Sequence, residues 1–311
     1  MNRQQRVNPR ERTGLGPTER DRPAQPRERI SKRYQWKLKS RELMLGERTF
    51  LMGILNVTPD SFSDGGQYAD PDRAFARAVE LEEEGADILD IGAESTRPGS
   101  QRISEAEELR RLIPVLKRLR GKLAIPISVD TYKSGVAEKA IEHGAEIIND
   151  PSGALFDLQL PRVATKYDSG LVINHMRGTP ETWAKLPPIK DLMRSIHIDI
   201  EAALHRVRQA GVQKHQIVID PGLGFGKRRE QNAEIIAKLG TLSIFDLPLL
   251  IGPSRKAFLQ KELPELTEYA TAGAVAASIL NGAHIIRVHN VKAMKPVVEV
   301  ADAIRQSTYR E

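Results

Sequence analysis

Residues 50–66 read Phe-Leu-Met-Gly-Ile-Leu-Asn-Val-Thr-Pro-Asp-Ser-Phe-Ser-Asp-Gly-Gly, so that an apolar run passes directly into a polar, glycine-ended loop. The run is continuously apolar, which is typical of a strand buried on both faces of a parallel sheet. Pro59 and the two closing glycines would also suit a long surface turn. Folding alone does not require Asn, Thr, Asp and Ser at the end of a buried strand. The stretch therefore favours a site at the carboxyl end of this strand.

The rest of the chain repeats the same pattern of a short apolar run followed by a longer segment with 3.6-residue periodicity. Eight such repeats predict a parallel sheet covered by helices, and their number favours an α/β fold of the closed (β/α)8 TIM barrel type over an open sheet. The predicted strands cover residues 50–55, 87–91, 125–129, 146–148, 170–173, 216–219, 248–251 and 284–288. The predicted helices include residues 72–84, 104–119, 133–143, 191–210, 231–239 and 270–281.

A pair of Rossmann domains is the main alternative to the barrel, and its fingerprint is missing from the sequence. Residues 222–226 read Gly-Leu-Gly-Phe-Gly, one residue short of the G-x-G-x-x-G pattern. The segment is not a P-loop either, because Pro221 and Arg228 occupy positions where that motif has glycine and Ser or Thr. Residues 34–45 precede the first barrel strand and could form a hairpin that closes the bottom of the barrel.

The basic charge of the chain is concentrated in its first residues. The 311 residues carry a net charge of +6, and residues 1–33 contain nine Arg and one Lys against four acidic residues, which accounts for all of it. This Arg- and Pro-rich segment has almost no large apolar side chains, so we expect residues 1–33 to be a disordered extension. It could be a basic arm for anionic partners or a dispensable extension. Residues 34–311 are predicted to form one catalytic barrel domain.

The composition also disfavours several classes of protein. A neutral folded part argues against a nucleic-acid binder, because such binding depends on cations that neutralise phosphates. No apolar run approaches the roughly 20 residues of a membrane span, and no apolar segment marks a secretory signal. The chain has no cysteine, which removes disulfides, thiolate metal sites and cysteine nucleophiles. We therefore expect no membrane partner and a cytoplasmic location.

Polar residues stand at the ends of most predicted strands. In a (β/α)8 barrel these ends meet at one rim, where catalytic groups are placed. Asp or Asn after a strand is also a common N-cap of the next helix, and this is an equal alternative for Asp90 or Asp150 taken alone. Capping does not explain so many carboxylates, amides and cations together, and the set predicts a site. Its members are Asn56, Asp90, Glu94, Asp130, Asn149, Asp150, Asn174, His175, Asp220, Ser254, Arg255, Lys256, Arg287 and His289.

The predicted site combines two kinds of group. Its buried-strand carboxylates and amide suit a flat heterocycle with amino and ring N–H groups, because a carboxylate accepts two parallel N–H donors. These residues are Asp130, Asn149 and Asp220, and Lys256 would donate to ring acceptors. The cations Arg97, Arg287 and His289 suit phosphate. The sequence has no H-E-x-x-H motif, no serine-centred elbow and no Cys/His cluster, which disfavours protease, hydrolase and zinc functions.

In order and spacing, these segments resemble the motifs of the dihydropteroate synthase family. Residues 56–66 and 94–99 look like the two signature loops of that family. The other matching segments are Ser128-Val129-Asp130-Thr131, Ile148-Asn149-Asp150, His175-Met176, residues 220–227, Ser254-Arg255-Lys256 and Arg287-Val288-His289. The resemblance covers about residues 35–305.

The resemblance implies a TIM barrel that joins 6-hydroxymethyl-7,8-dihydropterin diphosphate to p-aminobenzoate in folate biosynthesis. The products would be 7,8-dihydropteroate and pyrophosphate. The family also implies a homodimer and a Mg²⁺ ion at Asn56. The residues that it assigns to the chemistry are Asp130, Lys256, Arg97 and Arg287.

The motifs further imply a role for each substrate-binding position. The pterin would be held by Asp130, Asn149, Asp220 and Lys256, with Met176 and Phe225 lining its pocket and Arg287 packing on its face. The diphosphate would be bound by Asn56, Arg97, Arg287 and His289. The p-aminobenzoate would be framed by Phe62, Thr96, Pro98, Ser254 and Lys256. Loops 57–66 and 95–100 would close over the site and exclude water.

The chain departs from the family pattern at four positions. Pro151 and Ala154 stand where an aliphatic residue and a second glycine are usual. Arg177 replaces a usual Gln, and Asn290 replaces a usual Asp. None of these changes removes a residue assigned to chemistry. Residues 97–99 carry no insertion of the kind found in sulfonamide-insensitive forms, so the sequence predicts sulfonamide sensitivity.

Two other functions compete with this interpretation. A methyltransferase barrel could bind methyltetrahydrofolate through similar Asp and Asn residues, but it would not need the loops at 56–66 and 94–99 or the Ser-Arg-Lys segment at 254–256. A regulatory or non-catalytic pterin-binding paralogue would not need Asn56, Arg97, Asp130 and Lys256 to be intact, and all four are present.

Overall fold

The computed structural model describes residues 32–58, 70–95 and 99–307. Most of the predicted N-terminal extension lies outside these ranges. The same is true of four predicted site residues, namely Phe62, Thr96, Arg97 and Pro98.

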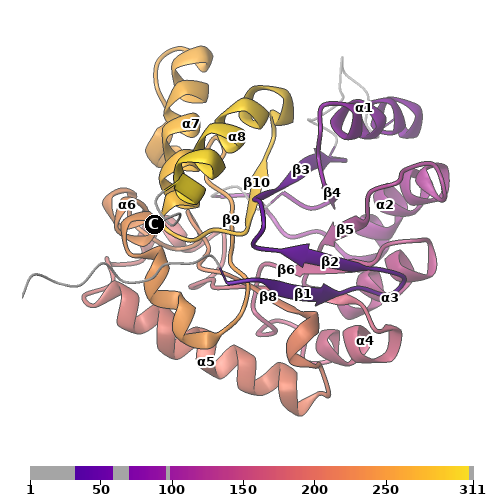
Figure 1. The fold of residues 1–311 in the computed structure, drawn as a ribbon. Helices are drawn as coiled ribbons and strands as arrows, with labels where there is room; N and C mark the ends of the chain where they lie inside the picture. The colour runs from indigo at the N-terminus through magenta and orange to yellow at the C-terminus, as the bar shows by residue number, and fades with distance from the viewer. Residues whose placement is uncertain (1–31, 59–69, 96–98, 308–311) are drawn as a thin grey trace, which may run out of the picture.

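Eight parallel strands form the centre of the molecule (Figure 1). They are β3 (Phe50–Asn56), β4 (Ile88–Gly92), β5 (Ile127–Asp130), β6 (Ile147–Asp150), β7 (Gly170–Asn174), β8 (Ile217–Asp220), β9 (Leu250–Ile251) and β10 (Ile285–Val288). The spatial order is β8-β7-β6-β5-β4-β3-β10-β9, and a parallel bridge between Ile219 and Leu249 joins the two edges. The predicted barrel is therefore confirmed, with every predicted strand shifted by at most two residues at either end.

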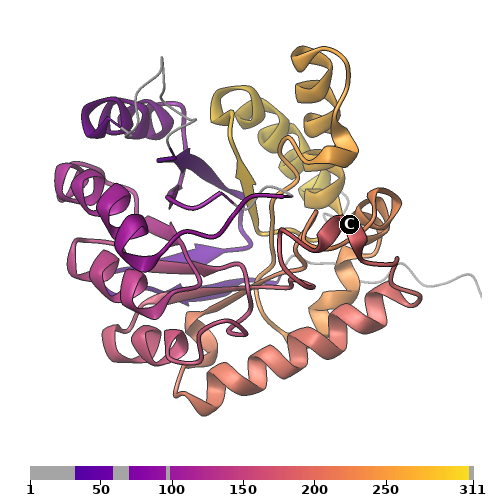
Figure 2. The same ribbon diagram turned by 180° about the vertical axis from the view of Figure 1, so that it is seen from behind.

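Helices surround the strands, as the view from behind shows (Figure 2). They are α1 (Pro71–Glu83), α2 (Glu105–Leu119), α3 (Ser134–Glu142), α4 (Leu160–Tyr167), α5 (Leu192–Gln209), α6 (Arg229–Ala237), α7 (Pro264–Leu280) and α8 (Val291–Ser307). The prediction for α7 was wrong at its start, which is at Pro264 rather than near Ala270. Proline suits the first turn of a helix, and the exposed Leu266 and Tyr269 obscure the periodicity there.

A two-stranded hairpin closes the amino-terminal end of the barrel, as predicted. Strands β1 (Tyr34–Lys37) and β2 (Glu42–Leu45) pair antiparallel and lie in front of the barrel in Figure 1. Trp36 is fully buried, and its Nε1 donates to the backbone oxygen of Gln216 at 2.8 Å. A Cβ on Gly170 would lie 2.5 Å from Leu38, so this glycine lets the hairpin approach the strands. The carboxyl end of the barrel is left for the site.

No helix within residues 32–58, 70–95 and 99–307 combines the length and the apolar character that a membrane crossing requires.

Candidate active site

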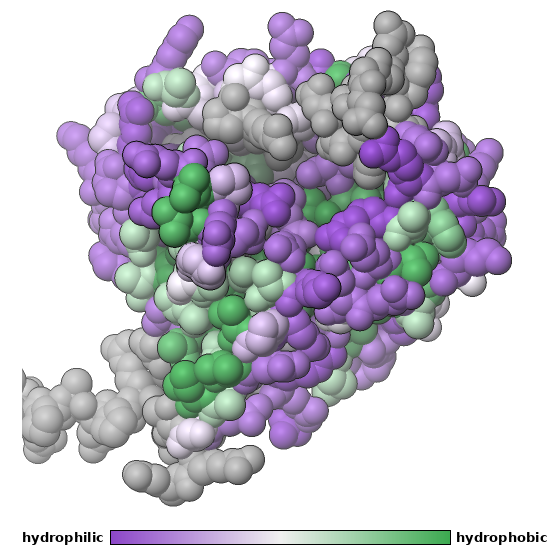
Figure 3. Space-filling model, turned by 90° about the horizontal axis from the view of Figure 1, so that it is seen from above, coloured by the Kyte–Doolittle hydropathy of each residue, from purple (hydrophilic) through white to green (hydrophobic). Residues whose placement is uncertain are grey.

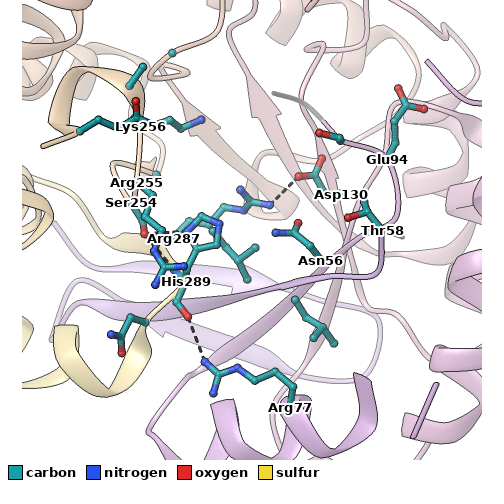
Figure 4. A pocket seen from close by; sticks show the side chains of 18 of the residues that line it. Asn56, Thr58, Arg77, Glu94, Asp130, Ser254, Arg255, Lys256, Arg287 and His289 are labelled. Carbon is teal, nitrogen blue, oxygen red and sulfur yellow. Dashed lines mark hydrogen bonds and ion pairs between the residues drawn. The ribbon is translucent and has the colours of Figure 1, made fainter. Parts of the chain in front are cut away.

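A cavity of about 1030 Å³ lies at the carboxyl ends of the barrel strands (Figure 4). Eight of the predicted site residues line it, and they come from strands on opposite sides of the barrel. These eight are Asn56, Glu94, Asp130, Ser254, Arg255, Lys256, Arg287 and His289. The lining also includes Thr58, Arg77 and Trp183. The structure therefore brings together residues that are far apart in the sequence, as the barrel prediction requires.

Arg287 joins two carboxylates at the floor of this site. Its Nε donates to Oδ2 of Asp90 at 2.6 Å, and its Nη2 donates to Oδ2 of Asp130 at 2.7 Å. Asn149 donates from Nδ2 to the same Asp90 oxygen at 3.2 Å. The sequence interpretation left Asp90 open between a helix cap and a site residue, and the structure places it inside the barrel, bound to Arg287. The available signal was its position within the otherwise apolar strand β4, where a buried charge requires a partner.

Burial perturbs the acid–base behaviour of the ionisable groups here. It raises the pKa of Asp130 to about 7, although the charge of Arg287 opposes this shift. Burial also lowers the pKa of Lys256 to about 8, and the nearby Arg287 cation adds to the effect. The pKa of Asp220 is raised by burial, against the hydrogen bond that its carboxylate accepts from the backbone of Gly222 at 2.7 Å. Asp130 and Lys256 line the same cavity, and perturbed groups in one cavity are typical of a functional site.

An apolar wall adjoins the Lys256 side of the cavity. Met176, Trp183 and Phe225 form one buried cluster, in which the rings of Trp183 and Phe225 meet edge to face with centroids 5.2 Å apart. The Nζ atom of Lys256 lies 4.4 Å from the centroid of the Phe225 ring. The structure thus brings the predicted Met176 and Phe225 together beside Lys256. No motif pointed to Trp183, which reaches the cavity from a short 3₁₀ helix (Trp183–Lys185).

The glycine-rich segment 222–226 holds this wall in position. Lys227 donates from Nζ to the backbone oxygens of His175, Gly222 and Phe225 at 2.9, 2.6 and 3.3 Å. Gly222 has a φ of +70°, and a Cβ there would lie 2.0 Å from the His175 oxygen. Burial lowers the pKa of Lys227 well below its ordinary value. The segment therefore packs against the end of β7, and Lys227 is a second residue that the sequence interpretation missed.

The cavity also has groups that suit an anion, around Ser254 and His289. Oγ of Ser254 lies 3.0 Å from Nδ1 of His289 and accepts the backbone N–H of His289 at 3.2 Å. Arg77 donates from Nη2 to the backbone oxygen of His289 at 3.3 Å, and Figure 4 shows it approaching from α1. The sequence interpretation missed Arg77 because it lies in the middle of a helix rather than at a strand end. Helix packing alone brings it here.

Two of the four departures from the family pattern, Pro151 and Asn290, have a local explanation. Asp150 accepts hydrogen bonds from the backbone of Ser152 and Ala154 at 2.8 and 2.6 Å, so this turn does not use the N–H that Pro151 lacks. Ala154 has a φ of 59°, the left-handed conformation that favours the usual glycine. Asn290 accepts the backbone N–H of Ala293 at 3.1 Å and so caps α8, as an Asp would.

Arg177, the fourth departure, donates to the backbone oxygen of Pro187 at 2.6 Å. Among the described residues, no group of three or more His, Cys, Asp or Glu side chains is placed to hold a metal ion.

The comparisons with known proteins agree with the fold. A sequence model of the family described as pterin binding enzyme matches residues 52–289. The chain is 42% identical to a dihydropteroate synthase of Synechocystis over 263 residues, which cover 83% of this chain and 91% of that protein.

Two solved structures illustrate the similarity in three dimensions. The Yersinia pestis dihydropteroate synthase with a sulfonamide drug complex is 36% identical, with a TM-score of 0.81, and the match covers 88% of this chain and 99% of that one. The Xanthomonas albilineans dihydropteroate synthase with 4-aminobenzoic acid is 37% identical, with a TM-score of 0.80, and the match covers 87% and 98% of the two chains.

Proposed function

The chain belongs to the pterin-binding enzyme family, and we propose that its barrel is a transferase that joins 6-hydroxymethyl-7,8-dihydropterin diphosphate to p-aminobenzoate. The products are 7,8-dihydropteroate and pyrophosphate, in the synthesis of tetrahydrofolate. One observation carries the proposal. Buried carboxylates and an amide gather around Arg287 at one end of a barrel, beside the cationic and polar groups of a single cavity.

The pterin fits the buried side of this cavity. Asp130 and Asp220 supply oxygens for the amino and ring N–H donors of the heterocycle, which a carboxylate accepts in pairs. Lys256 donates to the ring carbonyl or nitrogen, and Phe225 provides an apolar surface next to it. Asn149 has the donors and the acceptor of an amide for the same polar edge. Ion pairs with two carboxylates fix the orientation of the Arg287 guanidinium, which can stack on the pterin ring.

The diphosphate fits the side of His289 and Asn56. Mg²⁺ in such sites is usually bound through one or two protein oxygens, with substrate phosphates and water as the other ligands. The amide oxygen of Asn56 at the cavity wall suits this arrangement. The ion would neutralise charge on the leaving diphosphate. His289 and Arg287 add donors from the protein, and Arg97 is proposed for the same role from its motif alone.

The p-aminobenzoate is proposed to lie near Ser254 and Lys256, both at the cavity wall. The remaining proposed contacts, Phe62, Thr96 and Pro98, rest on the motifs. The methylene carbon of the pterin loses its bond to the diphosphate oxygen and gains a bond to the aniline nitrogen, which releases one proton. An arylamine is already neutral at pH 7, so the reaction needs no strong base to generate the nucleophile. Stabilising the departing diphosphate is therefore the main task of the site.

We further propose a cytoplasmic homodimer. Helices α7 and α8 pack against each other and expose several large apolar side chains. These residues are Leu266, Tyr269, Leu280, Val300 and Ile304. Figure 3 shows hydrophobic patches that interrupt a largely hydrophilic face of the molecule. An apolar face of this kind suits a second copy of the chain. Light scattering of the purified protein tests this, since a monomeric mass at micromolar concentration would contradict it. The cysteine-free sequence suits a reducing cytoplasm.

The activity is tested by pyrophosphate release from the pterin diphosphate. We expect release to depend on both p-aminobenzoate and Mg²⁺, and to stop when EDTA is added. Asp130→Ala and Arg97→Ala should each abolish it, and retained release in either variant would contradict the site. Binding of the pterin without release in the wild-type protein would instead identify a non-catalytic paralogue. Sulfonamides should inhibit by competing with p-aminobenzoate, and unchanged turnover at saturating drug would contradict that expectation.

A further inference from the structure

His289 is held from two sides by groups that do not belong to its own strand. Ser254 follows β9 and His289 follows β10, and these strands are neighbours in the barrel. Oγ of Ser254 accepts the backbone N–H of His289 at 3.2 Å and lies 3.0 Å from Nδ1 of its ring. On the other side, Arg77 donates to the backbone oxygen of His289 at 3.3 Å. Two contacts of 3.2 and 3.4 Å to Glu84 orient the Arg77 guanidinium.

These contacts favour one position of the hydroxyl proton. The backbone N–H of His289 occupies one of the two lone pairs of the Ser254 oxygen, so either tautomer of the ring could make the contact at Nδ1. Only when Ser254 donates to Nδ1 does its own proton have an acceptor among these contacts. A neutral imidazole carries one N–H, so a ring that accepts at Nδ1 must carry its proton on Nε2. His289 lines the cavity, and its Nε2 is the ring nitrogen away from Ser254.

We infer that Ser254 is a positioning residue that fixes His289 as the Nε2–H tautomer, with a donor presented to the diphosphate of the substrate. This role rests on the proposed function and goes beyond the contact of Ser254 with p-aminobenzoate. A donor that is held in place before the substrate binds does not lose orientational freedom on binding. Ser254 therefore serves both halves of the reaction, one directly and the other through His289.

A double-mutant cycle on pyrophosphate binding tests this inference. Titration calorimetry with pyrophosphate and Mg²⁺ would compare the wild-type protein, Ser254→Ala, His289→Ala and the double variant. We expect Ser254→Ala to weaken binding by about tenfold, the scale of one hydrogen bond to a charged group. In the His289→Ala background the same change should have less than about a twofold effect, since Ser254 acts through the ring. Equal losses in both backgrounds, or no measurable binding by the wild-type protein, would overturn the inference.

Two further readouts separate positioning from a merely structural role. Ser254→Thr keeps the hydroxyl and should bind pyrophosphate within about threefold of the wild type, whereas a loss equal to that of Ser254→Ala would count against the inference. Nitrogen-15 NMR at pH 8 should show His289 with its proton on Nε2 and a hydrogen-bonded Nδ1, and a mixture of tautomers in Ser254→Ala. An Nδ1–H tautomer in the wild type would overturn it. The NMR measurement of the His289 tautomer does not need catalytic turnover. Failure of the proposed reaction would therefore be recognised separately, in the pyrophosphate-release assay.

Discussion

Both ends of the barrel bury side chains, but those at the amino-terminal end are apolar and those at the carboxyl end are polar or charged. At the amino-terminal end the strands present aliphatic side chains to the hairpin. This cluster comprises Trp36, Leu38, Leu45, Phe50, Met52, Ile88, Ile147, Val172, Val218, Leu250 and Ile285. At the carboxyl end the same strands bury Asp90, Asn149 and Asp220 and partly bury Asp130 and Arg287.

The change from apolar to charged side chains takes place within single strands. Ile88 and Asp90 lie on the same strand, two residues apart, and neither is exposed to solvent. Burial of Ile88 contributes to stability. Burial of a carboxylate costs free energy even when it is paired, and at this end it raises the pKa of Asp130. The difference indicates that the hairpin end maintains the fold and that the cavity end is shaped for binding and chemistry.

The largest effect on stability is expected from Trp36→Ala at the hairpin end. It removes a fully buried indole and its hydrogen bond to Gln216, which should lower the free energy of unfolding by about 3–5 kcal/mol. Urea unfolding measures this, with the exposed Met44→Ala as a control that changes it by less than about 0.5 kcal/mol. The folded fraction should keep the kcat of the wild type. A large fall in kcat would contradict the assignment of stability to the hairpin end and of chemistry to the cavity end.

Lys227→Met should affect both properties, because this residue supports the cavity wall. Loss of the side-chain amine leaves three backbone oxygens without their donor, at a cost of about 3 kcal/mol in the free energy of unfolding. Since the segment carries Phe225, KM for the pterin diphosphate should also rise. Steady-state kinetics and urea unfolding check both effects. The matched control is Lys238→Met, whose exposed pair with Glu234 contributes little. An unchanged KM would show that the wall does not depend on Lys227.

A narrow pH optimum is expected from the cavity end. Asp130 must be ionised to accept N–H donors, and Lys256 must be protonated to donate. With pKa values of about 7 and about 8, kcat/KM for the pterin diphosphate should fall about tenfold per unit below the first and above the second. Lys256→Arg keeps its charge and should remove the fall at high pH. A flat profile from pH 5 to 10 would contradict this prediction.

The ionisation of Asp130 and Lys256 also makes the stability of the fold depend on pH. The pKa of Asp130 is raised in the folded state, so its contribution to stability is present below pH 3.8 and is lost as the pH rises through about 7. The pKa of Lys256 is lowered from 10.5 to about 8, so the unfolded chain binds this proton more tightly. Its contribution to stability therefore rises between pH 8 and 10.5.

The smallest effect concerns the cap of α8 at Asn290. Asn290→Ala removes the acceptor for the backbone N–H of Ala293 and should cost about 1 kcal/mol of stability. Asn290→Asp restores the residue usual in the family. It should be as stable as the wild type or more so by a few tenths of a kcal/mol, because a negative charge is favourable at a helix N-terminus. Thermal unfolding measures both changes. A destabilised Asp variant would show that Asn has a further role at the cavity wall.

The sequence was sufficient for the barrel and for the residues at strand ends. Apolar runs and helical periodicity located all eight strands, and a parallel barrel places their carboxyl ends together. This explains why Asn56, Asp130 and Arg287 could be placed in one cavity in advance. The hairpin at the opposite end was also predicted, and its packing is confirmed by Trp36.

The residues that were missed reach the site by tertiary packing rather than by their position in a strand. Arg77 depends on where α1 brings it relative to His289, which follows β10, and Trp183 depends on a short 3₁₀ helix. Lys227 binds backbone oxygens, which no side-chain pattern can reveal. Asp90 was noticed, but its role depends on the partner Arg287, which is far away in the sequence. The roles of Arg97 and Phe62 stay predictions from the motifs.

The most direct test of the division between the two ends is Asp130→Asn, with activity and stability measured on the same preparation at pH 8. Asparagine keeps the shape of the side chain and an acceptor for Arg287, but it removes the buried charge. We predict that kcat/KM for the pterin diphosphate falls by at least about 100-fold, while the free energy of unfolding stays the same or rises, since an ionised buried carboxylate is lost. Near-normal activity together with a loss of more than about 2 kcal/mol of stability would contradict the account.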